Sequence, residues 1–389
     1  MRVLHVITRM IIGGAQENTL FNCLDLHREY KDDVLLVTGP AHGPEGDLLT
    51  EGRAGDLPVK FVPSLQRAIN PRHDWNALTQ LRAIIRQFQP DVVHTHSAKG
   101  GLLGRRAAFK ERVPAIIHTV HGAPFHPYQS WIARNFFQRC EARAASWCDH
   151  MISVADAMTD LMVHARVAPR EKFTTIYSGM DVEPFLRADN SRDATRNALG
   201  LEPHHVVFGK IARLFHLKGH DDLITAAPKL VAACPHVKFL WVGDGILREP
   251  LTQRIREMGL EKHFVFTGLV PPAEVPRMIG AMDALVHTSY REGLARALPQ
   301  ALIAGRPVIS YDVDGAREVA INDETGYLVD PGNTDRLSER LIQLATDPAA
   351  RRRMGQTGRE RFTDQFRHQT MTRLIRHLYE ETLKQSPRR

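Results

Sequence analysis

The feature that most constrains the fold is an alternation between short apolar runs and longer periodic stretches, which occurs twice along the chain. In the first half, the runs that predict strands are RVLHVIT, DVLLVTG, PDVVHTH, PAIIHTV and DHMISV. Each is apolar almost throughout, as expected for parallel strands that are buried on both faces. The stretches 75–88, 99–112 and 130–147 between them predict helices. Such an alternation predicts a parallel sheet with right-handed crossovers.

The same alternation restarts after about residue 190. The predicted strands are HVVFGKIA, VKFLWVG, HFVFTG, DALVHTS and RPVISYD, and the predicted helices lie around 220–233, 246–258, 272–281 and 335–346. A chain of 389 residues is long enough for two cores. We therefore expect an α/β protein with two Rossmann-like domains, 1–185 and 186–365, whose parallel sheets face an interdomain cleft. The polar stretch 181–197 is the predicted linker.

Composition narrows the class of protein. The chain is 43% hydrophobic and 24% charged, and no apolar run approaches the roughly 18 residues of a membrane span. Four separated cysteines without a CxxC pair indicate buried thiols in a reducing compartment. The strand-like start MRVLHVIT lacks the cleavage site of a secretory signal. We expect a cytoplasmic protein.

The positive charge is concentrated at the C-terminal end. Residues 351–389 hold 11 Lys and Arg against 4 Asp and Glu, which equals the net charge of +7 for the whole chain. A basic helix or tail at 366–389 is expected, either solvated, packed back on the first domain, or attracted to anionic lipid. No recognition motif accompanies the charge, so nucleic acid is not an expected partner.

Two glycines follow the first predicted strand, at the carboxyl edge where open parallel sheets bind ligands. Gly13 and Gly14 open a predicted helix, whose first N–H groups and positive end favour an anion. The segment is not GxGxxG, and no acidic residue ends the second strand, which argues against a dinucleotide fold. The alternative is a tight turn without a ligand.

Four histidines follow two neighbouring strands: His94 and His96 on one, His118 and His121 on the other. A single histidine at a strand end is usually a structural hydrogen-bonding group, but four together make a site an equal alternative. A zinc site would need further Cys, Asp or Glu ligands at suitable spacing, and none follows. We expect no metal at these histidines.

The second half has a more specific pattern. Arg213 and Lys218 lie on the loop after HVVFGKIA, where a planar guanidinium and a point-charge ammonium suit a diphosphate. The sequence Gly243-Asp244-Gly245 predicts a tight turn after the next strand. Glu292-Gly293 then precede a helix that carries Gln300, and polar side chains two helical turns apart can contact one bound molecule.

Asp312 and Asp314 form a DxD pattern, whose two carboxylates are a candidate pair of ligands for a divalent cation. Alternation along an extended segment would point both carboxylates the same way. The pattern lies far along the second domain, however, and Gly315 follows it in a turn. Because Arg213 and Lys218 already match the charge of a diphosphate, we expect no metal site here.

Taken in order over nearly the whole chain, and together with SGMDVEPF at the domain junction, these motifs resemble family 4 retaining glycosyltransferases of the GT-B fold. The resemblance implies transfer of a hexose from a UDP- or GDP-linked donor to a sugar, glycolipid or polyprenyl-linked acceptor, with retention of anomeric configuration. It implies no cofactor and no metal, because the nucleotide sugar is a co-substrate. The expected setting is synthesis of cell-envelope polysaccharide or glycolipid.

The resemblance also implies roles for individual residues. The Gly14 N–H would lie near the donor diphosphate, and His121 would contact the transferred sugar near its reacting carbon. Arg213 and Lys218 would neutralise the departing diphosphate, and Glu292 would hydrogen-bond the sugar hydroxyls. The further donor-binding positions are Gly13, Gly243, Asp244, Gly293, Leu294, Ala295, Arg296 and Gln300.

Three positions depart from the family pattern. Gln300 stands where the family has a second glutamate that binds the ribose hydroxyls, and an amide can still accept and donate hydrogen bonds there. Ala295 and Arg296 stand where the family has Gly and an apolar residue. We interpret these as variation within a subgroup. The alternatives are another GT-B enzyme, such as a nucleotide-sugar epimerase, or a catalytically silent sugar-nucleotide-binding protein, which Gln300 alone favours.

The resemblance places the acceptor on the first domain, at the loops 39–56, 63–74, 97–104 and 122–131. Their sequences do not specify an acceptor, and the candidate contacts are His94, His96 and Lys99.

The predicted helix 130–147 combines aromatic and basic side chains: Trp131, Phe136, Phe137, Arg134, Arg139 and Arg143. The segment 99–112 adds further basic residues. This combination suits the surface of an anionic membrane, and the inner face of the plasma membrane is the expected location. The alternative is that the aromatic rings face the sheet and the arginines are solvated.

Overall fold

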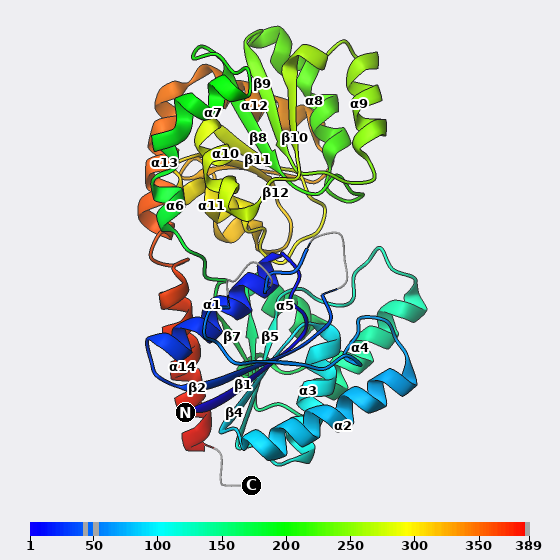
Figure 1. Cartoon of the computed structure of the whole chain (residues 1–389). Coiled ribbons are helices and arrows are strands. Elements are labelled where there is room, and N and C mark those ends of the chain that lie inside the picture. The colour runs from blue at the N-terminus through cyan, green and yellow to red at the C-terminus, as the bar shows by residue number, and fades with distance from the viewer. Residues whose placement is uncertain (42–45, 50–53, 386–389) are drawn as a thin grey trace. The chain divides into compact units, whose positions relative to one another are not determined.

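The computed structural model describes residues 1–41, 46–49 and 54–385. The chain divides into two compact units (Figure 1). Unit 1 comprises Met1–Met180 with Gln365–Arg389, and unit 2 comprises Asp181–Asp364. Each unit is an α/β structure around a parallel sheet, so the predicted pair of Rossmann-like domains is confirmed. The first boundary lies five residues before the predicted one and the second lies one residue before it.

The sheet of unit 1 has seven parallel strands in the order β3-β2-β1-β4-β5-β6-β7. Their bounds are β1 Arg2–Arg9, β2 Asp33–Gly39, β3 Val59–Phe61, β4 Val92–His96, β5 Ala115–Val120, β6 His150–Ser153 and β7 Phe173–Thr175. The five predicted strands are present, whereas β3 and β7 have only three residues each, too few to give a readable pattern. The register pairs His5 with His94 and His96 with Thr119, which places the histidines on adjacent strands.

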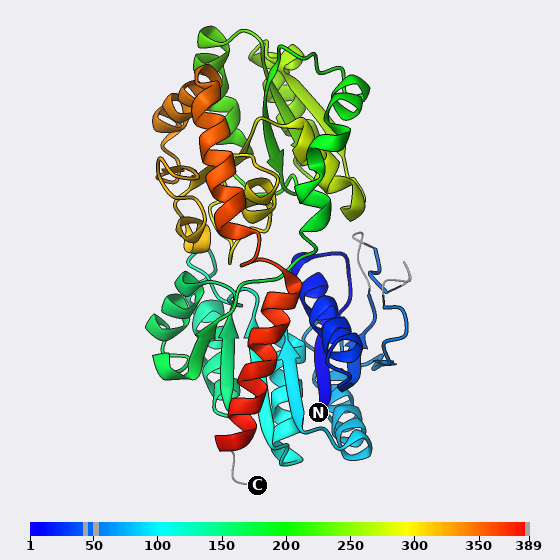
Figure 2. The same ribbon diagram turned by 90° about the vertical axis from the view of Figure 1, so that its left-hand side faces the viewer.

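Helices cover both faces of this sheet (Figures 1 and 2). They are α1 Gly14–Arg28, α2 Pro71–Phe88, α3 Ala98–Lys110, α4 Trp131–Ala145, α5 Asp156–His164, the short turn η1 Arg170–Lys172, and α14 His368–Gln385. Helix α2 begins four residues before the predicted start, because the Asn70 side chain caps it and Pro71 occupies its first position.

The predicted C-terminal tail is helix α14, which packs beside α1 in unit 1 (Figure 2). Met371, Ile375 and Tyr379 are buried in the same core as residues of α1 and β1. At the edge of this contact, the His368 ring lies 2.8 Å from the carboxylate of Asp25. The interpretation of this segment as a solvated tail is therefore wrong for the buried face of α14.

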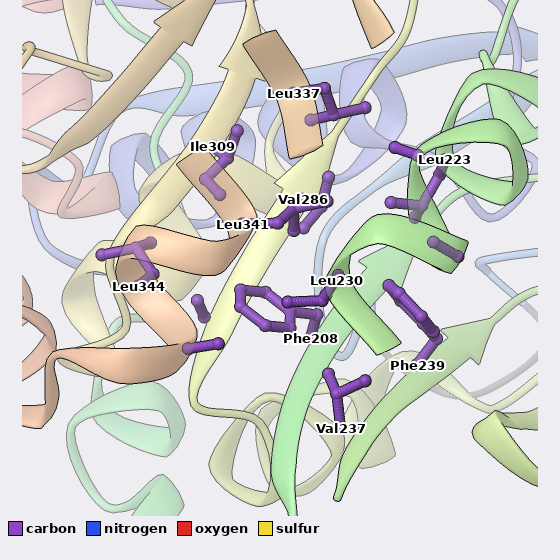
Figure 3. Close-up of a cluster of buried hydrophobic side chains, with 14 of the residues drawn as sticks. Phe208, Leu223, Leu230, Val237, Phe239, Val286, Ile309, Leu337, Leu341 and Leu344 are labelled. Atoms are coloured by element: carbon purple, nitrogen blue, oxygen red, sulfur yellow. The ribbon is translucent and has the colours of Figure 1, made fainter. Parts of the chain in front are cut away.

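The sheet of unit 2 has six parallel strands in the order β10-β9-β8-β11-β12-β13. The strands are β8 Val206–Ile211, β9 Val237–Val242, β10 Phe264–Gly268, β11 Ala284–His287, β12 Val308–Tyr311 and β13 Gly326–Val329. Its helices and short turns are α6 Glu183–Leu186, η2 Ala188–Ser191, α7 Arg192–Ala198, α8 His220–Ala233, α9 Arg248–Glu257, η3 Glu261–His263, η4 Pro272–Glu274, α10 Val275–Ala281, α11 Ala297–Ile303, η5 Asp314–Glu318, α12 Thr334–Thr346 and α13 Pro348–Phe362. Figure 3 shows how apolar side chains of α8 and α12 pack on the central strands, with Phe208 and Phe239 at the centre.

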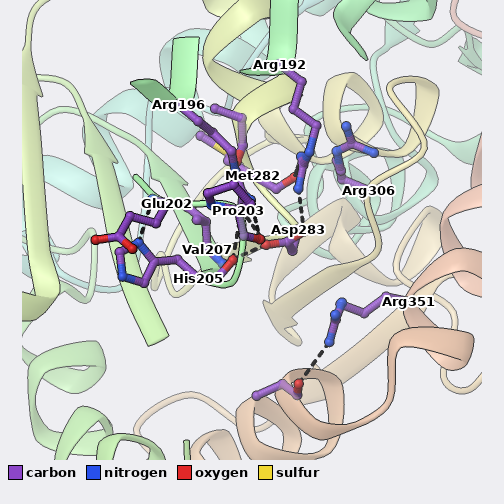
Figure 4. A network of polar contacts seen from close by, with 12 residues as sticks. Arg192, Arg196, Glu202, Pro203, His205, Val207, Met282, Asp283, Arg306 and Arg351 are labelled. Atoms are coloured by element: carbon purple, nitrogen blue, oxygen red, sulfur yellow. Dashed lines mark hydrogen bonds and ion pairs between the residues drawn. The ribbon is translucent and has the colours of Figure 1, made fainter. Parts of the chain in front are cut away.

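The predicted linker 181–197 is part of unit 2. It forms α6, η2 and most of α7, and Arg192 and Arg196 of α7 both reach the carboxylate of Asp283, at 2.6 and 2.8 Å (Figure 4). The Asp283 carboxylate also accepts the N–H of Val207, and the Arg196 guanidinium donates to the carbonyl oxygen of Ala281. The segment is polar, and on that ground the sequence suggested a linker. Its arginines, however, form ion pairs with Asp283 inside unit 2.

Candidate active site

In unit 2, the candidate residues follow strands that are neighbours in the sheet. The loop after β8 carries Arg213 and Lys218, the turn after β9 contains Gly243, and the loop after β11 carries Glu292. Carboxyl ends of adjacent parallel strands meet at one edge, which is where such sheets bind ligands. The structure therefore brings the predicted cations and carboxylate to a single edge of the sheet.

Lys218 and Glu292 form a direct ion pair across this edge, with their side chains 21% and 24% exposed. The Nε2 atom of His287, at the end of β11, lies 3.5 Å from the same oxygen of Glu292. Burial opposes ionisation of Glu292, but its contacts with His287 and Lys218 outweigh that effect and hold its pKa well below the usual range. Glu292 is thus an ionised hydrogen-bond acceptor throughout the neutral pH range.

Lys210 of β8 lies beneath this pair and is 1% exposed. Its ammonium donates to the carbonyl oxygen of Lys218 at 2.9 Å and to the hydroxyl of Thr288 at 2.6 Å. Burial, and next the charge of Lys218, lower the pKa of Lys210 to about 7. Lys210 therefore fixes the backbone at Lys218, and Gly219 is needed beside it because a Cβ there would lie 1.9 Å from the carbonyl oxygen of Thr288.

Arg213 is exposed at the start of the same loop, with its guanidinium 5.0 Å from the centre of the Phe215 ring. The loop packs against the predicted turn after β9, where the Leu214 N–H donates to the carbonyl oxygen of Asp244. Gly243 has a φ of 136°, and a Cβ there would lie 2.1 Å from the carbonyl oxygen of Ala212. The tight turn thus supports the loop that carries Arg213.

The segment 293–300 leads into a short helix. Gly293 and Leu294 lie in the loop, Ala295 is buried, and Gln300 is half-buried on α11, which begins at Ala297. Arg296 is the residue immediately before that helix. Glu292 and Gln300 therefore occupy the loop and the helix that the sequence predicted.

The two aspartates of the DxD pattern have separate partners. The Asp312 carboxylate accepts two hydrogen bonds from Arg317, both at 2.9 Å, and the Asp314 carboxylate accepts the N–H of Glu292 at 2.6 Å. Asp314 thus positions the backbone of Glu292.

In unit 1, Gly13 and Gly14 lie at the start of α1, as predicted, with Gly13 at the cap position. His121 follows β5 and is half-buried. Its Nε2 atom is hydrogen-bonded to Nδ1 of His96 at 3.1 Å. These residues lie at the carboxyl edge of the unit 1 sheet.

The prediction that His94 and His96 contact an acceptor is wrong. Both side chains are 0% exposed. The ring nitrogens of His94 bond to Tyr379 and Thr119, and those of His96 bond to His5 and His121. Burial lowers the pKa of both rings well below the usual value. They are neutral, internal hydrogen-bonding groups.

Lys99, the third acceptor-side candidate, lines a cavity of about 650 Å³ in unit 1. Its ammonium pairs with Asp74 at 2.6 Å and donates to the carbonyl oxygen of Ala68 at 2.9 Å. The cavity is also lined by Arg9 and Arg67 and by the apolar side chains Leu102, Phe136 and Phe137. It takes in parts of the predicted acceptor loops 63–74, 97–104 and 122–131, while residues 42–45 and 50–53 of the loop 39–56 lie outside the described residues.

Helix α4 exposes large apolar side chains beside basic ones. Trp131 is 76% exposed, Ile132 is 75% exposed and Phe136 is 52% exposed, and Arg134 and Arg139 are also exposed. The alternative that Trp131 and Phe136 face the sheet is therefore wrong, whereas Phe137 is half-buried. Both phenylalanines line the cavity. Within the part of the chain that the structure describes, no helix combines the length and apolarity needed to cross a bilayer.

Sequence reasoning missed Lys210, His287 and His5. Each lies within a run that is otherwise apolar, and each is at most 4% exposed. The sequence did offer one signal for these residues, which is a lysine or histidine inside a strand that is predicted to be buried on both faces. Such groups are buried only when they have interaction partners.

Comparisons with known proteins agree with this arrangement. The model of Glycosyltransferase Family 4 matches residues 16–184, and that of Glycosyl transferases group 1 matches residues 191–361. The UDP-Gal:alpha-D-GlcNAc-diphosphoundecaprenol alpha-1,3-galactosyltransferase of Escherichia coli is 27% identical over 350 residues, which cover 89% of this chain and 88% of that protein. The capsular polysaccharide biosynthesis glycosyltransferase CapM of Staphylococcus aureus is 23% identical over 343 residues, 85% of this chain and 87% of its own.

Among solved structures, HepE of Anabaena in complex with UDP superposes with a TM-score of 0.83 at 22% identity, covering 98% of this chain and all of its own. This likeness shows that the chain has the GT-B fold. The two family models together span most of both units, so the chain belongs to the family 4 glycosyltransferases.

Proposed function

We propose that the chain is a retaining glycosyltransferase that moves a hexose from a nucleoside-diphosphate donor without a metal ion. The observation that carries this proposal is the group at the carboxyl edge of the unit 2 sheet, where Lys218 contacts Glu292 and Arg213 lies on the same loop. Two cations and one ionised carboxylate match the two parts of a sugar nucleotide, an anionic diphosphate and a ring of hydroxyls.

Each side chain has a task in the reaction. Glu292, ionised, accepts hydrogen bonds from sugar hydroxyls and so orients the donor. As the bond between the anomeric carbon and the diphosphate breaks, negative charge grows on the departing phosphate, and Lys218 and Arg213 stabilise it. Lys210 and Asp314 hold the backbone of Lys218 and Glu292 at the required separation.

Relatives of the chain support a UDP-linked donor. HepE has been crystallised with UDP and with UDP-glucose, and the Escherichia coli relative takes UDP-galactose by its name. We favour a UDP-hexose over a GDP-hexose for this reason. Retention is proposed from membership of the family. Metal independence is supported by the separate engagement of Asp312 and Asp314 with Arg317 and the Glu292 N–H.

Nucleotide release with UDP-glucose, UDP-galactose and GDP-mannose, measured with and without EDTA, tests the donor and the metal. Loss of activity in EDTA with recovery in Mg²⁺ or Mn²⁺ would contradict metal independence. If the anomeric proton signal in the NMR spectrum of the product shows a configuration opposite to that of the donor, retention would be contradicted. Binding of nucleotide without any turnover would favour the silent binding protein instead.

Variants locate the diphosphate. Arg213→Ala and Lys218→Ala should each lower kcat/KM by on the order of 10²–10³, the range for a lost contact to transition-state charge. The control is Lys229→Ala, which removes an exposed lysine paired with Asp335 in the same unit and should leave kcat/KM unchanged. Near-neutral results for both test variants would place the diphosphate elsewhere.

For the acceptor, we propose a lipid-linked sugar phosphate that binds in the unit 1 cavity. Arg67 and Arg9 supply positive charge, while Leu102, Phe136 and Phe137 supply an apolar wall. The two carboxylates that also line the cavity are paired, Asp74 with Lys99 and Glu141 with Arg105, so the cavity suits an anionic group joined to an apolar one. The Escherichia coli relative acts on a GlcNAc-diphosphoundecaprenol by its name. Polysaccharide or glycolipid synthesis is the corresponding role.

The test is steady-state transfer to a short-chain polyprenyl diphosphate sugar. Arg67→Ala should raise the acceptor KM at least several-fold with little change in the donor KM. Arg72→Ala, which removes a nearby exposed arginine that does not line the cavity, is the matched control. Equal effects of both variants on the acceptor KM would show that the acceptor does not bind in this cavity.

We also propose that α4 docks on an anionic membrane surface, since Trp131, Ile132 and Phe136 are exposed beside Arg134 and Arg139. Each basic residue near such a surface contributes about 1 kcal/mol, so co-sedimentation should favour anionic over neutral liposomes and weaken with salt. Equal binding to anionic and neutral liposomes, or binding that survives Arg134→Glu with Arg139→Glu, would show that α4 is not the membrane-docking element.

A further inference from the structure

Three histidines of unit 1 form a hydrogen-bonded row that ends at His121. Nδ1 of His5 lies 3.0 Å from Nε2 of His96, and Nδ1 of His96 lies 3.1 Å from Nε2 of His121. His5 and His96 are both 0% exposed, and the three rings stack with centroids 5.3 Å apart at each step. The row runs from the middle of β1 to the carboxyl edge of the sheet.

A row of neutral imidazoles has only two arrangements of its protons. Each neutral ring has one N–H donor and one bare acceptor nitrogen, so the direction of one hydrogen bond fixes the direction of the next. In the first arrangement all three rings carry the proton on Nδ1. In the second all three carry it on Nε2.

The buried end of the row distinguishes these arrangements. Nε2 of His5 is buried and no protein group in the described chain hydrogen-bonds to it. With the proton on Nε2, His5 would bury an unpaired N–H, which native proteins avoid more strictly than an unpaired acceptor. Burial also lowers the pKa of His5 to about 3, so the ring is neutral at physiological pH.

We propose that His5 and His96 are positioning residues that fix the ring of His121 in the tautomer with its proton on Nδ1. His121 then presents an N–H donor, not a bare acceptor, to whatever its Nδ1 faces. The consequence for catalysis rests on the proposed sugar contact of His121, whereas the tautomer itself does not depend on it.

NMR of the ring nitrogens in protein labelled with isotopic histidine tests the proposal, with signals assigned from His121→Ala and His96→Ala. In the unaltered protein, His5, His96 and His121 should each show a protonated Nδ1 and a bare Nε2. A protonated Nε2 on His121 would overturn the proposal, even if no sugar transfer is ever detected. So would a metal ion found on His5, His94 and His96 by elemental analysis, because their nitrogens would then be ligands.

His96→Leu removes the ring that is hydrogen-bonded to Nε2 of the half-buried His121 and should convert His121 to a mixture of tautomers. If transfer requires the Nδ1–H form, kcat falls with the competent fraction, two-fold for an equal mixture, while the donor KM changes little. The control is Tyr379→Phe, which removes the buried hydroxyl bonded to His94, outside the row, and should leave the His121 spectrum unchanged. A single tautomer of His121 in a folded His96→Leu variant would show that the row does not set it.

Discussion

Substitution of Glu141 by glutamine tests the electrostatics at the wall of the unit 1 cavity, which Glu141 lines. Arg105 on α3 has a side chain that is 0% exposed, and its guanidinium lies 2.8 Å from the carboxylate of Glu141 on α4, which is 7% exposed. The contact is an ion pair without a well-aligned hydrogen bond, since the terminal nitrogens of Arg105 have no hydrogen-bond partner among the described residues. Glu141→Gln would leave Arg105 buried with a charge that nothing compensates.

The magnitude follows from the geometry. At an effective dielectric constant of about 20, two unit charges 2.8 Å apart attract by about 6 kcal/mol, and the cost of removing both from water offsets much of this. Deleting one partner of such a buried pair costs about 3–5 kcal/mol. For a unit of this size, each kcal/mol lowers Tm by about 2–4 °C, so Glu141→Gln should lower the Tm of unit 1 by at least about 6 °C.

Differential scanning calorimetry is the assay. The double substitution Arg105→Leu with Glu141→Leu removes both charges and should recover most of the lost stability, because apolar replacement of a buried pair is often neutral. Asp335→Asn, which breaks the exposed pair with Lys229 in unit 2, is the control and should cost less than about 1 kcal/mol. A Glu141→Gln variant that melts within a degree of the unaltered protein would refute the reasoning.

The remaining predictions concern unit 2. The pKa of Lys210 is about 7 in the folded state and 10.5 in the unfolded state, so the unfolded state binds more protons between these two pH values. Urea unfolding should therefore show that the protein is about 2 kcal/mol more stable at pH 9 than at pH 7. The substitution Lys210→Met should abolish this gain. Asp283→Asn leaves the buried Arg196 without its carboxylate and should cost about 3–5 kcal/mol by the same assay; a loss below 1 kcal/mol would mean that backbone acceptors alone hold α7. Gln300→Glu should lower the calorimetric Kd for the nucleotide several-fold through charge-assisted hydrogen bonds worth about 0.5–1.5 kcal/mol, and an unchanged Kd would show that Gln300 does not contact the ribose.

The strand pattern predicted both sheets because parallel strands buried on both faces leave a continuous apolar signal. It could not predict the fate of the segment 181–197. Arg192 and Arg196 read as solvated because their partner, Asp283, is far away in sequence, and only the fold brings the three together. Composition reports how polar a segment is, and it cannot report whether that polarity is satisfied internally.

The candidate site was predicted unevenly for a related reason. Arg213, Lys218 and Glu292 follow strands, so the topology alone placed them at one edge. The burial of His94 and His96 could not be read, because Tyr379, which covers His94, lies on α14 at the far end of the sequence. The contact of His5 with His96 could not be predicted, because a single histidine within β1 belongs to no recognisable sequence motif.

The return of α14 to unit 1 sets the order in which the chain can fold as a ribosome makes it. Residues 1–180 emerge first, but their core is incomplete without Met371, Ile375 and Tyr379. Unit 2 is one continuous stretch, 181–364, and all of it is synthesised before α14. Domains usually fold in the order in which they are made. Here unit 1 begins before unit 2 and is completed after it, so a nascent chain carries an uncovered α1 and an uncovered sheet face until α14 has been made.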